Sequence, residues 1–247
     1  MATRAAASSR SAPELSLETY SLFPYSSQHK DDARHLLERM RRYVLAFKYG
    51  RGDDGTGRDF AAIVEDLARQ GWACPAFDGV VQIVPVPPVD LPRGGARRGA
   101  AKLEPNWELA QALARRIPGA RASRMWERTA SVGWAEDQAP PSLADHLASL
   151  QPTGTEVPLV DRVVLIHDLI TRGTEVFACA LALREAGYTG PVAAFVVAQA
   201  TGRNPGDLQL ASCLVHRIEG SSRSHYPNRH DDRIWCDLDA RFEPDDH

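Results

Sequence analysis

Residues 161–190, DRVVLIHDLITRGTEVFACALALREAGYTG, decide the fold of this chain. They begin with the apolar run 163–166, which is long enough for one buried strand. His167 and Asp168 follow, then a polar turn at 171–175, then a helix with an apolar stripe that ends at Gly187. Such a turn offers free N–H groups and the helix dipole to a phosphate. The acid before the turn, Asp168, suits ribose hydroxyls or a divalent metal beside that phosphate.

The rest of the chain alternates apolar strand patterns with amphipathic helix patterns. Helices are predicted at about 31–48, 58–70, 104–116, 142–150 and 175–186, and strands at about 79–86, 162–166 and 192–198. Connections of crossover length between these elements predict an α/β fold with a mainly parallel, twisted sheet flanked by helices. We expect a disordered leader at 1–16, one domain at 17–219 and a polar C-terminal tail at 220–247, the last either mobile or laid over the domain as a strap.

Composition narrows the function classes. The 247 residues are 43% apolar and 25% charged with a net charge of −3, which is a globular composition without a whole-chain case for nucleic-acid binding. No apolar run approaches the roughly 20 residues of a membrane span, so we expect no membrane association. The four cysteines are scattered without a CxxC pair, and this favours a reduced, cytoplasmic setting. The Cys and His residues after position 212 match no zinc-finger spacing, and we expect no metal there.

The turn at 167–175 resembles the PRPP-binding motif of type I phosphoribosyltransferases. That motif has two acids, two mostly apolar residues and then Thr-Thr-Gly-x-Thr; here the register reads HDLITRGTE. Upstream, YVLAFKYG at 43–50, PVP at 85–87, an arginine-rich loop at 93–102 and a helix from Asn106 follow the order of ComF-like members of that family. The resemblance covers about residues 36–200. It does not extend to the N-terminal zinc ribbon that is common in ComF-like members, which has no counterpart here.

The resemblance implies a site for PRPP or another phosphorylated ribose. Asp168 would hold the ribose hydroxyls as the catalytic residue, and Thr171, Gly173 and Thr174 would surround the 5′-phosphate with help from Arg172. Basic side chains elsewhere would contact pyrophosphate and other anionic groups: Arg93, Arg97, Arg98 and Lys48. Mg²⁺ would arrive with PRPP, held mainly by the ligand and water. Residues 124–150 would form a flexible hood or, alternatively, an uncommitted surface excursion, and members of the family are often homodimers.

Two positions depart from the family motif. His167 replaces the first acid, although its ring can still hydrogen-bond one ribose hydroxyl. Glu175 replaces the last Thr, and its carboxylate either repels a phosphate or points away on the first helical turn.

Two functions therefore stay open. One is transfer of phosphoribose to a nitrogen nucleophile with release of pyrophosphate. The other is a catalytically inactive module in nucleotide sensing or in DNA uptake, with the basic loop at 93–102 against a nucleic-acid backbone.

Overall fold

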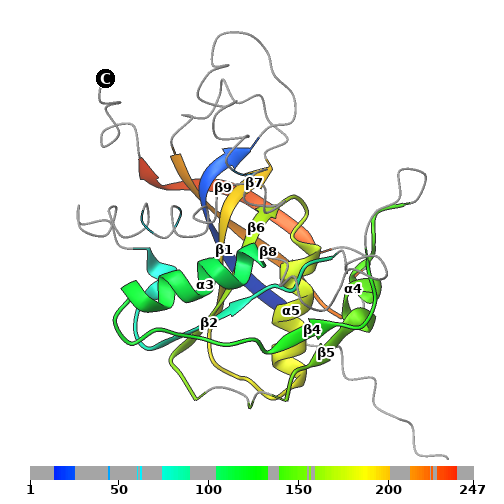
Figure 1. Cartoon of the computed structure of the whole chain (residues 1–247). Coiled ribbons are helices and arrows are strands. Elements are labelled where there is room, and N and C mark those ends of the chain that lie inside the picture. The colour runs from blue at the N-terminus through cyan, green and yellow to red at the C-terminus, as the bar shows by residue number, and fades with distance from the viewer. Residues whose placement is uncertain are drawn as a thin grey trace, which may run out of the picture.

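The computed structural model describes residues 14–25, 44, 60, 62, 74–89, 104–132, 139–154, 156, 159–200, 212–222, 224 and 227–237 (Figure 1). These residues form a mixed sheet with helices on both of its faces. No helix in these ranges is long and apolar enough to cross a membrane.

The central sheet has seven strands in the order β3-β2-β6-β7-β1-β8-β9. The first five are parallel: β3 (Arg121–Ala122), β2 (Val81–Pro85), β6 (Arg162–Ile170), β7 (Val192–Ala200) and β1 (Leu15–Tyr25). The last two, β8 (Ser212–Gly220) and β9 (Asn228–Asp237), are antiparallel to their neighbours. β6 therefore lies inside the parallel part, where the carboxyl ends of strands form the usual ligand edge.

Helices cover the two faces of this sheet. On one face α3 (Pro105–Arg116) and the short 3₁₀ helix η2 (Pro75–Phe77) pack on side chains such as Ile166 and Phe195. On the other face α5 (Thr174–Glu185) packs on Leu165 and Val196. Alternate residues of β6 and β7 thus enter opposite cores, which explains why these strands read as continuous apolar runs. The predicted α/β class with a mainly parallel sheet is confirmed.

A second, small sheet lies beside α5. It pairs β4 (Trp126–Arg128) with β5 (Leu150–Pro152), and α4 (Leu143–Ser149) connects them in sequence. α4 packs on α5 (Figure 1). Its first turn has a capping box, in which Ser142 Oγ accepts from the Asp145 N–H and the Asp145 carboxylate accepts from the Ser142 N–H.

The predicted elements that fall on described residues are present, with shifted ends. The strands predicted at 79–86 and 192–198 correspond to β2 and β7, and the helices at 104–116, 142–150 and 175–186 correspond to α3, α4 and α5. β6 runs four residues beyond the predicted end at 166, because its ladder with β7 continues to the Ile170–Gln199 pair. His167 and Asp168 therefore lie within the strand. Most of the predicted helices 31–48 and 58–70 lies outside the described residues, but Val44 and Phe60 are helical and buried.

Two strands extend into the segments predicted as leader and tail. β1 begins at Leu15, inside the predicted leader, and Leu15 and Leu17 are buried in the core. β9 lies inside the predicted polar tail, where it is the outermost strand of the sheet. A polar sequence suits an antiparallel edge strand with one face and one edge in water. The division into leader, domain and tail is otherwise still a prediction.

Candidate functional site

A sharp turn joins the end of β6 to the start of α5. Thr171 and Arg172 are exposed on it, and Gly173 follows as the N-cap residue with φ 80° and ψ 8°. A side chain at position 173 would also overlap Ile218 Cδ1. Glycine is therefore favoured at position 173 for two reasons: the backbone is in the left-handed region, and Ile218 of β8 approaches closely.

The N-cap residue of α5, Gly173, has no side chain that could cap the helix. Its carbonyl accepts the Phe177 N–H at 2.9 Å, which is the first bond of the helix, and no side-chain cap hydrogen bond is present among the described residues. These groups and the positive end of the helix dipole lie beside the exposed Thr171 and Arg172, at the carboxyl end of a parallel strand. Such a terminus is a suitable place for an anion.

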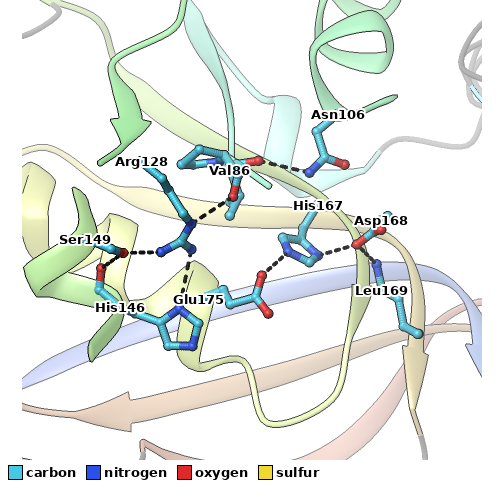
Figure 2. Close-up of polar contacts among 10 residues, drawn as sticks. Val86, Asn106, Arg128, His146, Ser149, His167, Asp168, Leu169 and Glu175 are labelled. Carbon is cyan, nitrogen blue, oxygen red and sulfur yellow. Dashed lines mark hydrogen bonds and ion pairs between the residues drawn. The ribbon is translucent and has the colours of Figure 1, made fainter. Parts of the chain in front are cut away.

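His167 contacts two carboxylates at once (Figure 2). Its Nε2 lies 2.8 Å from Glu175 Oε2 in a hydrogen-bonded ion pair, and its Nδ1 lies 2.8 Å from Asp168 Oδ1. The second contact is an ion pair in which charge attraction is the main component. Burial of the ring lowers the pKa of His167, but the charges of Asp168 and Glu175 outweigh this and raise that pKa to about 10. The imidazole is therefore a cation at neutral pH.

Glu175 lies on the first turn of α5 and turns its carboxylate to His167. Burial alone would raise the pKa of Glu175, but the charge of His167 holds it below its usual value. The side chain thus lies on the first helical turn, as one of the two alternatives expected, and the charge of its carboxylate is compensated by the His167 imidazolium. Repulsion of a phosphate at the turn is correspondingly weaker than for an unpaired carboxylate.

Asp168 is mostly buried and already has partners. Its Oδ1 accepts the Leu169 N–H at 2.6 Å, in addition to the contact with His167. Its side chain is 12% exposed. To bind ribose hydroxyls as predicted, the Asp168 carboxylate would have to do so while it also contacts the His167 imidazolium.

A second polar group, which the sequence did not reveal, surrounds Arg128 of β4 (Figure 2). The guanidinium is buried and donates to Ser149 Oγ at 2.5 Å, to His146 Nδ1 at 3.4 Å and to the Pro87 carbonyl at 3.4 Å. Burial lowers the pKa of His146, so that its Nδ1 is available as an acceptor. Burial also lowers the pKa of Arg128, and the Glu175 charge acts in the opposite direction. Arg128 is therefore a buried cation whose hydrogen-bond partners are neutral and whose nearby acid is Glu175.

These contacts tie the small sheet to the end of β2. Asn106 on the first turn of α3 donates from Nδ2 to the Val86 carbonyl at 2.9 Å, and Arg128 reaches the next carbonyl, that of Pro87. The Val86 N–H donates to the Ile166 carbonyl of β6 at 2.9 Å. The end of β2 is thus held from three sides at the point where the chain enters the predicted pyrophosphate loop.

Several predicted site residues cannot be placed. Arg93, Arg97, Arg98 and Lys48 lie outside the described residues. The structure brings together His167, Asp168, Thr171, Arg172, Gly173, Thr174 and Glu175 around one turn. Within the predicted hood at 124–150, residues 133–138 are outside the described part, and β4 and α4 are the regular elements. Its flexibility is still a prediction.

The side chains at the turn do not fit a chelated Mg²⁺. Mg²⁺ needs oxygen ligands in octahedral arrangement, and here both carboxylates face a buried imidazolium. In the described part of the chain, no three His, Cys, Asp or Glu side chains are grouped so that they could hold a metal ion.

Comparisons with known proteins give only distant structural similarity. No family model and no curated protein matches the chain. Among solved structures, a hypoxanthine phosphoribosyltransferase from Staphylococcus aureus is 8% identical with a TM-score of 0.31, over 66% of this chain and 76% of that one. A point mutant of the hypoxanthine phosphoribosyltransferase from Trypanosoma cruzi, in a ternary substrates complex, is 10% identical with a TM-score of 0.30, over 67% and 79%. These TM-scores are too low to assign a family, so the fold class rests on the strand order above.

Proposed function

We propose that this chain is a phosphoribosyltransferase-like protein that binds a phosphorylated ribose, such as PRPP or a nucleotide, at the turn 171–175. The observation that carries the proposal is the start of α5, which has no side-chain cap among the described residues and has Gly173 in the left-handed conformation at the carboxyl end of β6. The motif resemblance supports it, because that motif falls on this turn. The N–H groups of the first helical turn would bind the phosphate, and Arg172 would add a charge-assisted contact.

The geometry supports binding more strongly than transfer. Asp168, the residue proposed to hold the ribose hydroxyls, also holds the His167 cation, and Glu175 stands where the family motif has a hydroxyl. A hydroxyl can donate to a phosphate, whereas a carboxylate cannot. The second candidate function is therefore a catalytically inactive, nucleotide-sensing module on the same fold. If the protein is an active enzyme, it transfers phosphoribose to a nitrogen nucleophile, and PRPP brings the Mg²⁺ ion.

Calorimetric titration with PRPP tests the proposal. We expect saturable binding that is weakened in Arg172→Gln, because that change removes a cation from the turn. The matched control is Arg115→Gln, which removes another exposed arginine, on the last turn of α3. If both variants bind like the unchanged protein, or if PRPP does not bind to folded protein, the turn is not a phosphate site. Release of pyrophosphate in the presence of amines and bases then separates the active enzyme from the sensing module.

A further inference from the structure

His167 occupies the space between two acids that come from different elements. Its Nδ1 is 2.8 Å from Asp168 Oδ1 on β6, and its Nε2 is 2.8 Å from Glu175 Oε2 on α5. Figure 2 shows the ring lying between these carboxylates. The imidazole thus joins the strand to the helix across the turn, in the place where a cation held by both acids would lie.

The ring has the charge that this place requires. It is 7% exposed, so an uncompensated charge would be strongly disfavoured, but each nitrogen faces a carboxylate oxygen. The resulting pKa of about 10 agrees with a ring that is protonated on both nitrogens. Two acids are therefore joined by one fixed cation that belongs to the chain.

The groups on the surrounding elements complete the charge balance. From β4, the Arg128 guanidinium contributes a second positive charge, whose influence reaches Glu175. From α4, His146 is neutral because burial lowers its pKa, and from α5 burial raises the pKa of the Cys179 thiol to about 12. Among the described residues, Asp168, Glu175, His167 and Arg128 therefore contribute two carboxylates and two cations, and these four charges balance without an added metal ion.

We propose that His167 is the built-in counter-cation of the turn, so that the ribose-phosphate part of a ligand binds there without a divalent metal ion. The inference rests on the proposed function for the identity of that ligand. It concerns only metal binding by the carboxylates of Asp168 and Glu175. It makes no statement about a metal ion that is bound to the pyrophosphate oxygens of a ligand. A divalent ion at Asp168 and Glu175 would have to displace the imidazolium or lie against it, and both are unfavourable.

Calorimetry with ribose 5-phosphate tests the ligand part, because this probe has no pyrophosphate to carry a metal ion. The folded protein is titrated in EDTA and again in millimolar Mg²⁺. We expect dissociation constants that agree within about twofold. Binding that tightens about tenfold or more in Mg²⁺ contradicts the proposal, because a metal ion then contributes to the site.

Titration with Mn²⁺ alone, followed by the loss of its free electron-spin-resonance signal, tests the counter-cation part. We expect no Mn²⁺ binding at Asp168 and Glu175 in the unchanged protein, and binding in His167→Asp, which adds an acid and removes the cation. His167→Asn serves if the first variant does not fold. Mn²⁺ binding by the unchanged protein that is lost in Asp168→Asn overturns the proposal, and so does a folded His167→Asp without affinity for Mn²⁺. If ribose 5-phosphate binds under neither condition, the proposed function fails, while the Mn²⁺ result still decides the role of His167.

Discussion

Replacing His167 by Gln tests the charged state of the imidazole through stability. The glutamine carries no charge and can donate to only one of the two carboxylates. His167 has an ordinary pKa of 6.5 and a folded-state pKa of about 10. Its protonation therefore stabilises the fold fully below pH 6.5, and this contribution is lost as the pH rises toward about 10. The gap between the two pKa values, at about 1.4 kcal/mol per unit, corresponds to an upper limit of roughly 5 kcal/mol.

The assay is urea denaturation of both proteins across this pH window. We expect the variant to be less stable near pH 6.5 and the difference in unfolding free energy to shrink by up to about 1.4 kcal/mol per pH unit. His230→Gln is the control, since His230 is 44% exposed and pairs with Glu219 at 2.9 Å. An exposed pair of this kind contributes no more than about 1 kcal/mol. A difference for His167→Gln that is constant with pH, or that grows with it, would show that the folded protein holds a neutral ring.

Three further predictions concern the elements that build the site. Gly173→Ala should destabilise the protein by about 1–3 kcal/mol in urea denaturation, because φ is 80° and the new methyl meets Ile218; Gly187→Ala, with φ 96° and nothing within 4 Å, should cost less, and equal losses would contradict the close approach of β8. Ser142→Ala should cost about 1 kcal/mol through loss of the α4 capping box, and an unchanged urea midpoint would argue against that cap. Cys179, buried and with its pKa raised to about 12, should stay unmodified when native protein is treated with iodoacetamide and mapped by peptide mass spectrometry, whereas rapid labelling would place the thiol in contact with solvent.

The sequence predicts the strand–turn–helix unit well because its signals are local. The apolar run before His167 is buried on both faces of the sheet, the helix after Glu175 packs on one of these faces, and Gly173 ends the turn. The strand's true end at Ile170 depends on pairing with β7, which no local pattern contains. β9 escaped prediction because most of its residues are polar, and an edge strand tolerates polar residues on the face and edge that meet water.

The polar contacts around the turn could be predicted only in part. Two acids and a histidine within nine residues are visible in the sequence, but the ring could have turned to a ligand instead of bridging the acids. The Arg128 group depends on the pairing of β4 with β5, which brings residues 18 to 21 positions apart into contact. A local signal existed: His146 and Ser149 follow Leu143 at intervals of three, on the buried side of α4.

The most direct test of phosphate binding at the start of α5 is a titration of ¹⁵N-labelled protein with ribose 5-phosphate, followed by amide chemical shifts. We expect the largest, saturable shifts at the N–H groups of Gly173, Thr174 and Glu175, with little change at Gly187, just beyond the other end of the same helix. Shifts concentrated elsewhere, or none at saturating ligand, would contradict the claim that this turn binds a phosphorylated ribose.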